Sequence, residues 1–347
     1  MVNLPTCKES ALSASAPVGD QRDGIHPALV VTNLRVGFGG GAAIVDGVDI
    51  TLHRGRILCL VGESGSGKSL TALSLMRLLP PAAQLSAETF MLDGEDISHA
   101  DEKTLNDIRG NRMAMVFQEP MTALNPVMTV GEQVTETSMV HQGLTRQAAL
   151  ATALEMFRRV QIPAPEARLD AYPHQLSGGM RQRVMIAMAL ICRPAILIAD
   201  EPTTALDVTI QSQILRLIDQ LRSELGTAVL FITHNLAVVA EIADEIAVMY
   251  AGRIVERASR EALFGDPMHP YTLALFAAMP RANDRGRPLA AIEGQVPAPD
   301  ATPPGCRFAP RCPFAIPRCT EAYPPLREIR PGHSVSCWRA PLEEHVQ

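Results

Sequence analysis

The spacing of apolar residues predicts alternating strands and helices. Near the start, 28–36 and 45–52 alternate apolar and polar side chains, as half-buried strands do, and a glycine-rich turn at 37–41 separates them. Four later stretches are continuously apolar and predict buried strands of a parallel sheet: 57–61, 113–117, 195–200 and 228–233. Shorter apolar runs predict a strand at 90–92 and a hairpin formed by 246–250 and 253–256.

Residues with helical spacing lie between these strands. Helices are expected at 70–79, 145–160 and 205–225, the last one ended by Gly226. Thr129 and Glu132 have the spacing of a capping box, and 129–172 forms a helical block that interrupts the strand and helix alternation. A further helix would place four apolar residues on one face: Met180, Val184, Met188 and Ile191.

One glycine-rich segment between a buried strand and a helix fits the G-x-x-x-x-G-K-[ST] pattern. Its residues are Gly62, Glu63, Ser64, Gly65, Ser66, Gly67, Lys68 and Ser69. Free backbone N–H groups and the positive end of the helix suit a phosphate chain, which Lys68 would bridge while Ser69 ligates Mg²⁺. The alternative is a chance glycine loop, which the strand and helix context disfavours.

Polar residues also follow the other buried strands. Gln118, the adjacent carboxylates Asp200 and Glu201, and His234 each stand where a strand ends. Asp200 and Glu201 suit a division between a metal-bound Asp and a Glu that polarises water. Each residue alone could equally be an ordinary polar strand end, and Asp200 could cap the next helix.

A second helix start follows the helical block. Leu176 and Ser177 precede Gly178 and Gly179, so Ser177 would cap the helix while the two glycines leave N–H groups bare. A plain N-cap explains the serine but not both glycines. We therefore expect a second anion-binding segment in the same chain.

Composition narrows the class of protein. The chain has 347 residues, 47% hydrophobic and 20% charged, with a formal net charge of −6, which argues against a dedicated nucleic-acid binder. The apolar stretch at 184–192 is shorter than the ~20 residues that span a bilayer. Residues 1–26 lack the basic start and apolar core of a secretory signal and predict a flexible cytoplasmic tail.

These motifs, in this order, resemble those of the ATPase subunit of an ATP-binding-cassette (ABC) transporter over about residues 28–265. The resemblance implies an α/β P-loop NTPase fold, with a RecA-like core, an antiparallel β subdomain and a helical subdomain at about 123–182. The implied domains are a flexible tail at 1–26, the ATPase domain at 27–265, and a small Cys-containing C-terminal domain at 266–347.

The resemblance also implies a head-to-tail pair of cassettes with two ATP molecules between them. Each ATP would contact the 62–69 loop, Gln118, Asp200, Glu201 and His234 of one cassette and Ser177, Gly178 and Gly179 of the other. Glu201 would be the general base and His234 the γ-phosphate sensor, and Ser69, Gln118 and Asp200 would hold Mg²⁺.

Three further positions take roles from the resemblance. Asp207 would act across the pair, and Phe38 stands where the family places its adenine-stacking aromatic, although it could instead be a local packing plug. Leu70 departs from the family, because many members have Thr there, which leaves a hydroxyl contact to the α-phosphate in doubt.

The C-terminal sequence narrows the resemblance to oligopeptide and dipeptide importers. The run from Asp266 to Thr272 and the cysteine pattern after Gly305 resemble the tail of that group. This implies a peripheral protein on the cytoplasmic face of the inner membrane, working with a second ATPase subunit, favoured as a heterodimer, two membrane permease subunits and, indirectly, an extracytoplasmic binding protein. Nickel and other cargoes remain alternatives, as does, more distantly, a soluble cassette protein that acts on ribosomes or DNA.

Four of the seven cysteines cluster near the C-terminus, at Cys306, Cys312, Cys319 and Cys337. In a reducing compartment such clustering favours a metal site over disulfides. The spacing fits neither the short zinc pattern nor the usual ferredoxin run. The resemblance suggests an iron–sulfur cluster, [4Fe–4S], with zinc and free thiols as alternatives.

Overall fold

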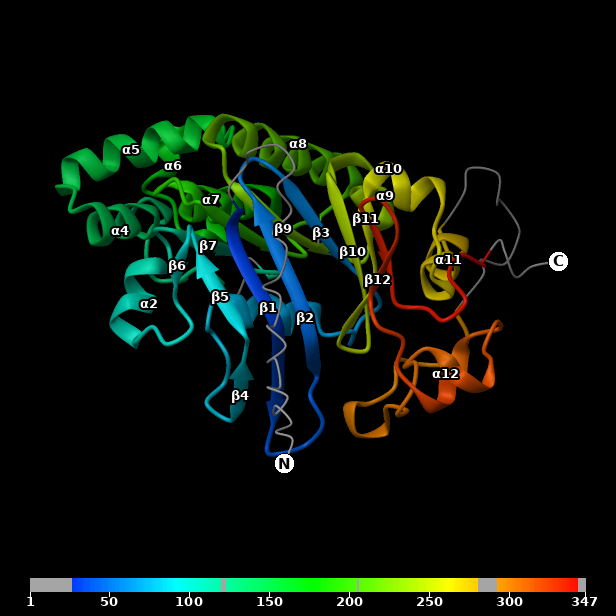
Figure 1. Cartoon of the computed structure of the whole chain (residues 1–347). Coiled ribbons are helices and arrows are strands. Elements are labelled where there is room, and N and C mark those ends of the chain that lie inside the picture. Colours follow the sequence, from blue (N-terminus) through cyan, green and yellow to red (C-terminus); the bar gives the residue numbers. More distant parts are fainter. Residues whose placement is uncertain (1–26, 120–122, 205, 280–291, 343–347) are drawn as a thin grey trace, which may run out of the picture.

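The computed structural model describes residues 27–119, 123–204, 206–279 and 292–342, and all structural statements below concern these residues. The expected N-terminal tail, part of the segment after Gln118, and Ala205 lie outside them. Figure 1 shows the helical block at one end of the molecule, the sheets in the middle, and the C-terminal part at the other end.

An eight-stranded sheet forms the centre of the fold, in the order β12-β13-β11-β10-β3-β9-β8-β7. Neighbouring strands from β10 to β7 are parallel, whereas β11, β13 and β12 add to the edge in antiparallel pairs. The bounds are β3 (Ile57–Val61), β7 (Met113–Val116), β8 (Ile196–Asp200), β9 (Ala228–Thr233), β10 (Glu245–Tyr250), β11 (Arg253–Ser259), β12 (Arg327–Arg330) and β13 (His333–Val335). The four continuously apolar runs are thus confirmed as parallel strands.

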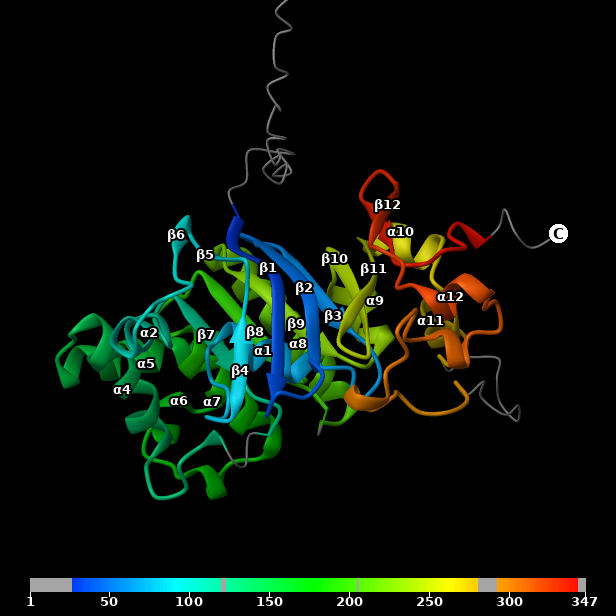
Figure 2. The same cartoon turned by 60° about the horizontal axis from the view of Figure 1, so that its bottom comes forward.

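A second, antiparallel sheet lies over one face of the first and has the path β2-β1-β5-β6, with β4 paired to β1 (Figure 2). Its strands are β1 (Pro27–Phe38), β2 (Val45–His53), β4 (Ala83–Ser86), β5 (Thr89–Leu92) and β6 (Glu95–Asp96). The alternation expected at 28–36 and 45–52 is confirmed, since buried and less buried side chains alternate along much of β1 and β2.

The side chains of the central strands divide between two apolar cores. On β3, Ile57, Cys59 and Val61 face the core beneath the helices, while Leu58 and Leu60 face the core shared with the antiparallel sheet. Both faces are therefore covered, which explains why this strand is apolar at every position.

Helices connect the strands and build the helical block. Their bounds are α1 (Lys68–Leu75), α2 (Glu102–Ile108), α4 (Val130–Gln142), α5 (Arg146–Arg159), α6 (Pro165–Arg168), α7 (Gly178–Leu190), α8 (Val208–Leu225), α9 (Leu236–Ile242), α10 (Arg260–Gly265), α11 (Pro270–Ala277) and α12 (Pro317–Glu321), with short 3₁₀ turns at Pro173–Gln175, Pro299–Ala301 and Ala309–Arg311. The capping box of Thr129 and Glu132 is confirmed at the start of α4, and Gly226 ends α8.

One helical prediction needs correction and another was incomplete. The helix expected at 70–79 ends at Leu75, because Arg77 adopts a left-handed φ of +54° and turns the chain before Pro80. The four apolar residues predicted for one face of the helix from Gly178 all pack against the core beneath the helices, but burial is not confined to that face, since residues 182–187 are all buried. It is enclosed between β7 and the neighbouring helices α4 and α5, so amphipathic spacing does not describe it.

The C-terminal part is joined to the central sheet. β13 pairs with β11, and His333 Nε2 lies 2.7 Å from the buried Glu256 Oε1, which ties the two strands together by side chains as well. The hydrophobic pattern did not predict β12 and β13, because both strands are short and β12 is mostly charged. The domain boundary at 265 and 266 stays a prediction.

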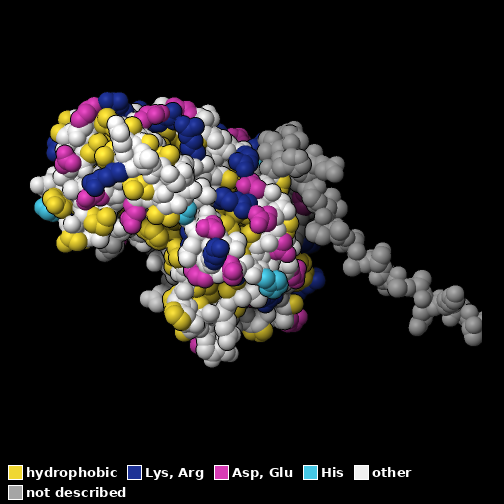
Figure 3. Space-filling model, turned by 90° about the vertical axis from the view of Figure 1, so that its left-hand side faces the viewer, with side chains coloured by type: hydrophobic (Ala, Val, Ile, Leu, Met, Phe, Trp, Pro, Cys, Tyr) yellow, Lys and Arg dark blue, Asp and Glu magenta, His cyan; other side chains and the backbone are white. Residues whose placement is uncertain are grey.

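Two observations bear on the exclusions drawn from composition. On the face shown in Figure 3, side chains of both charge signs are interspersed, in keeping with the low net charge. Within the described ranges, every helix is too short or too polar to cross a membrane.

Candidate functional site

The phosphate loop opens into a pocket of about 720 Å³ at the carboxyl ends of the central strands. Eleven of its lining residues were expected from the sequence: Gly62, Glu63, Ser64, Gly65, Gly67, Lys68, Ser69, Leu70, Gln118, Glu201 and His234. Ile44, Thr204 and Leu275 also line it and were not among the expected residues.

Glycine is required in the loop by close packing and by backbone shape. A Cβ on Gly62 would lie 2.2 Å from the Met249 carbonyl oxygen, so only glycine fits there. Gly67 precedes α1 with a φ of +103° and supplies no capping side chain. The first N–H groups of α1 are therefore aimed at the pocket without a side-chain cap, as phosphate binding needs.

Lys68 is held by its own loop. Its Nζ donates to the carbonyl oxygens of Gly62 at 2.8 Å and Glu63 at 2.9 Å, and the residue is only 5% exposed. Burial lowers the pKa of the amine, while the carboxylates of Glu201, Asp200 and Glu63 act to raise it. The amine is thus positioned and electrostatically suited to an anion at the pocket.

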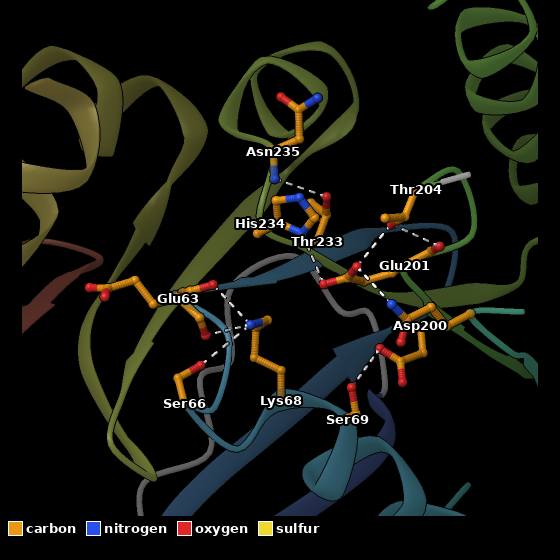
Figure 4. Close-up of polar contacts among 12 residues, drawn as sticks. Glu63, Ser66, Lys68, Ser69, Asp200, Glu201, Thr204, Thr233, His234 and Asn235 are labelled. Atoms are coloured by element: carbon orange, nitrogen blue, oxygen red, sulfur yellow. Dashed lines mark hydrogen bonds and ion pairs between the residues drawn. The ribbon is translucent and has the colours of Figure 1, made fainter. Parts of the chain in front are cut away.

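Ser69, which lines the pocket, and Asp200 are joined by a hydrogen bond (Figure 4). Ser69 Oγ donates to Asp200 Oδ1 at 3.2 Å, although 131 residues separate them. Burial, with a smaller contribution from the charge of Glu201, raises the pKa of Asp200, against the hydrogen bond from Ser69 and the charge of Lys68. A hydroxyl and a carboxylate oxygen side by side are a donor set that suits Mg²⁺.

Glu201 is the centre of a polar cluster in the same view. Its carboxylate lies 3.0 Å from His234 Nδ1 and accepts hydrogen bonds from Thr204 Oγ1 at 2.9 Å and Gln118 Nε2 at 3.3 Å. Its backbone φ is +45°, an uncommon conformation for a residue with a Cβ. Burial acts to raise the pKa of Glu201, but the hydrogen bonds from His234 and Thr204 outweigh it and lower the pKa overall.

The signature segment, residues 176–179, lies apart from these groups. Ser177 caps α7, its Oγ accepting from Met180 N at 3.4 Å, and Ser177 and Gly178 are exposed. Asp207 is also exposed and caps α8 through the N–H groups of Thr209 and Ile210. The N-cap predicted at Ser177 is therefore confirmed, while the nucleotide contacts expected of Ser177, Gly178, Gly179 and Asp207 stay predictions.

Phe38 is the expected site residue with the weakest geometric support. It ends β1, where it pairs with Ala83 of β4. Among the described residues, the pocket lining includes Ile44 from this region but not Phe38. The adenine-stacking role of Phe38 stays a prediction. Leu70 does line the pocket, and the loss of a hydroxyl contact to the α-phosphate there also stays a prediction.

Comparisons with known proteins identify the family. Residues 45–204 match the ABC transporter family, and residues 255–319 match the oligopeptide/dipeptide transporter C-terminal region. A probable peptide ABC transporter ATP-binding protein of Sinorhizobium fredii is 52% identical over 317 residues, which cover 90% of this chain and 95% of the relative. The chain belongs to the ABC transporter ATP-binding protein family.

Two further relatives of this ABC cassette have specific names. The dipeptide transport ATP-binding protein DppD of Bacillus subtilis is 47% identical, with 90% of this chain and 95% of the relative covered. The oligopeptide transport ATP-binding protein OppD of Salmonella typhimurium is 46% identical, with 91% and 94% covered.

Solved structures agree on the cassette fold. The cbiO1 part of a cbiONQ ABC transporter complex from Clostridium perfringens is 26% identical, with a TM-score of 0.60 over 69% of this chain and 91% of that one. The ATP-binding cassette MJ0796, a dimer bound to ADP and phosphate after hydrolysis, has a TM-score of 0.59 at 26% identity over 67% of this chain and 98% of that one. The ABC cassette is accordingly an ATPase.

Proposed function

We propose that this ABC cassette is one of two paired ATPase subunits that energise peptide import through separate membrane subunits. One observation carries the proposal: the Ser69, Asp200 and Glu201 cluster beside the phosphate loop occurs in the same chain as a C-terminal part similar to that of oligopeptide and dipeptide transporters. The relatives named for dipeptide and oligopeptide transport support the peptide cargo.

Binding of the nucleotide is assigned to the loop and to α1. The N–H groups at the start of α1 and the Lys68 amine would bind the outer phosphates. Ser69, Asp200 and Gln118 would hold Mg²⁺, which supplies positive charge to neutralise the phosphate oxygens. The donor set of hydroxyl, carboxylate and amide oxygens fits this hard cation.

Hydrolysis is assigned to the cluster around Glu201. Its lowered pKa keeps the carboxylate ionised at neutral pH, so it can accept a proton from an attacking water. His234 and Thr204 orient the carboxylate through their contacts at 3.0 and 2.9 Å. His234 would also contact the γ-phosphate, and Gln118 would link this cluster to the segment that leads into the helical block.

Pairing would complete the site. The exposed Ser177 and Gly178, with the partly exposed Gly179, would contact the ATP held by a second cassette, and the dimeric state of MJ0796 supports such a pair. A heterodimer is favoured by the sequence that begins α7. ATP binding would close the pair at the cytoplasmic face of the membrane, and hydrolysis would reopen it, with residues 119–130, described in part, carrying the motion to a permease subunit.

The test is co-purification. The full chain, tagged and expressed in its native host, should be isolated with two membrane subunits and a second ATPase subunit, and the complex should hydrolyse ATP faster when a peptide-loaded binding protein is added. A chain that is isolated with ribosomes and without any membrane subunit would contradict the proposal. Replacing the peptide by nickel complexes in the same assay tests the cargo.

We further propose that the four C-terminal cysteines hold an iron–sulfur cluster. All four line one small pocket with Phe308, Phe314 and Trp338. Burial and, to a smaller extent, the three neighbouring thiols raise the pKa of Cys306 to about 11, against a backbone hydrogen bond at Phe308 that lowers it. Among the described residues, however, no group of three or more His, Cys, Asp or Glu side chains is arranged to hold a metal ion. The gathering of four thiols, rather than their present geometry, is what supports a cluster.

Anaerobic purification tests the cluster. Iron and sulfide should be found in stoichiometric amounts, together with visible absorbance. Cys312→Ser should abolish the bound iron and sulfide and the absorbance. Cys192→Ser, at a buried cysteine outside the pocket, is the matched control and should retain them. Zinc in place of iron, or a colourless and metal-free chain, would contradict the cluster.

A further inference from the structure

The C-terminal part reaches the phosphate loop directly at Glu63. The Glu63 N–H donates to the Tyr271 hydroxyl at 2.8 Å. The two nitrogens of the Arg311 fork, Nη1 and Nη2, donate to the two carboxylate oxygens of Glu63 at 3.2 and 3.1 Å. A variable position of the loop pattern is thus bound at both its backbone and its side chain by residues more than two hundred positions later in the chain.

Arg311 is itself held in place. Its side chain is 7% exposed, and it donates to the carbonyl oxygens of Ile292 at 3.2 Å and Glu293 at 2.8 Å. The guanidinium also lies 5.7 Å from the Tyr250 ring centroid and 5.9 Å from that of Phe308. Because these contacts already restrict the side chain, little further rotamer entropy is lost when it binds Glu63.

A second arginine of the same segment reaches the loop through an intermediate turn. Arg307 binds the Asp46 carboxylate and the Ala251 carbonyl oxygen. Gly252, which follows Ala251 in the chain, donates its N–H to the Ser66 carbonyl oxygen of the loop at 2.8 Å. Residues 307–311 therefore support the phosphate loop at two separate places, directly through Arg311 and indirectly through the turn that Arg307 holds.

Glu63, which Arg311 binds, is also hydrogen-bonded to Lys68. The Glu63 carbonyl oxygen accepts the hydrogen bond from Lys68 Nζ, and Figure 4 shows the Glu63 side chain extending away from Lys68. The carboxylate is held on the outer side of the loop while the carbonyl faces the amine. Fixing the side chain from outside therefore fixes the carbonyl that orients Lys68.

We propose that Arg311 is a positioning residue for the nucleotide site, acting through Glu63 to hold the phosphate loop in its binding shape. Arg307 supports the same loop from the Ser66 side. The inference rests on the proposed ATP site, and it assigns to residues 307–311 of the C-terminal part an influence on nucleotide affinity that acts through the phosphate loop.

A double-mutant cycle on the purified full chain tests this role, with a fluorescent ATP analogue as the probe. Arg311→Gln should raise the Kd about tenfold and Glu63→Gln about fivefold, as expected for the loss of a charged, bidentate hydrogen-bonded pair. The double variant should bind no more weakly than Arg311→Gln alone, because both changes remove one interaction. Arg311→Lys, which keeps the charge but not the fork, should raise the Kd about threefold.

Controls separate positioning from general stability. Arg318→Gln, at an arginine that stacks on Trp338 in the same part of the chain, should leave the Kd within about twofold of the wild type. Thermal unfolding of each variant is measured alongside. A merely structural role would lower the Tm of Arg311→Gln without changing the Kd measured well below that temperature, and this result would overturn the proposal.

Further outcomes keep the inference distinct from the proposed function. A wild-type chain that does not bind the analogue contradicts the ATP site itself, whereas normal wild-type binding with an unchanged Arg311→Gln Kd contradicts only the positioning role. Additive effects in the cycle would also overturn it. If Arg311→Gln does not fold, Glu63→Gln decides: an unchanged or lower Kd, compared with Glu261→Gln at an exposed glutamate, overturns the proposal.

Discussion

Two helices of this ABC cassette begin at glycine-rich segments, and the two beginnings differ in what surrounds them. The loop before α1 is enclosed: Ser66 is fully buried, Lys68 is 5% exposed, and the preceding glycine supplies no cap. The start of α7 is open to solvent, and Ser177 caps it from within the same chain. The first segment is assembled within one chain, whereas the second offers an exposed surface to a partner.

The difference lies in the number of long-range contacts. Strands β3 and β8, α11 and the 307–311 segment all contribute residues around the phosphate loop. At the signature segment, the side-chain cap comes from three residues away. Substitutions in the first region should therefore change what an isolated chain binds, while substitutions in the second should change mainly what a pair of chains does.

The largest effect is expected at Glu201, because ATP hydrolysis in the paired cassettes needs both the enclosed loop and the open helix start. Glu201→Gln should lower ATP turnover of the assembled transporter by roughly 10² to 10⁴, because the general base is lost, while ATP binding is kept. Phosphate release and nucleotide binding are measured on the same preparation. The control is Glu224→Gln, at an exposed glutamate of α8. Near-normal turnover would rule out Glu201 as the base.

Lys68 tests the enclosed region in the isolated chain. Lys68→Met should raise the Kd for ATP by roughly 30-fold to 100-fold, since charge-assisted hydrogen bonds to phosphate contribute about 2 to 3 kcal/mol. Equilibrium binding to the purified chain provides the measurement. A Kd within a factor of three of the wild type would mean that the amine remains bound to the carbonyls of Gly62 and Glu63 in the complex.

Asp46 tests the support behind the loop. Burial acts to raise its pKa, but Arg253, Arg307 and Arg35 outweigh this and lower the pKa below 3.8. Asp46→Asn should therefore reduce the free energy of unfolding by about 2 kcal/mol at pH 7. Since the folded-state pKa is depressed, the stabilisation is complete above the unfolded pKa and is lost as pH falls through the folded value.

Denaturant unfolding of the wild type and Asp46→Asn at several pH values measures this difference. It should be constant from pH 7 to 5 and shrink below pH 4. Asp219→Asn, at a half-exposed aspartate that pairs with the mostly buried Arg222, is the control and should change stability by less than about 1 kcal/mol. A difference that grows on acidification would contradict the sign of the Asp46 shift.

The smallest effect is expected at the open helix start. Ser177→Ala should reduce the free energy of unfolding by about 1 kcal/mol through loss of the N-cap, and it should leave the Kd of the isolated chain for ATP unchanged. Chemical denaturation and the binding assay used for Lys68 measure both quantities. Weaker binding by the isolated variant would erase the distinction between the two regions.

Much of the site could be predicted because its signals are local. The 62–69 pattern, the strand-end residues Asp200 and Glu201, and the cap at Ser177 each depend on neighbours within a few positions. The parallel sheet then brings strand ends to one edge, which is why Ser69 and Asp200 meet as expected. The end of α1 at Leu75 and the burial of residues 182–187 all round α7 were missed, because a left-handed Arg77 and enclosure by α4 and α5 leave no periodic trace.

The amino-acid sequence by itself determined the strand and helix order and the chemical identity of the nucleotide site, because period and motif act over short distances. Only the tertiary structure decided that Tyr271 and Arg311 bind Glu63, that Thr204 holds Glu201, and that β13 extends the central sheet. Contacts such as the Arg311 and Glu63 pair join residues 248 positions apart. They arise from how whole elements pack, so no local spacing of residues encodes them.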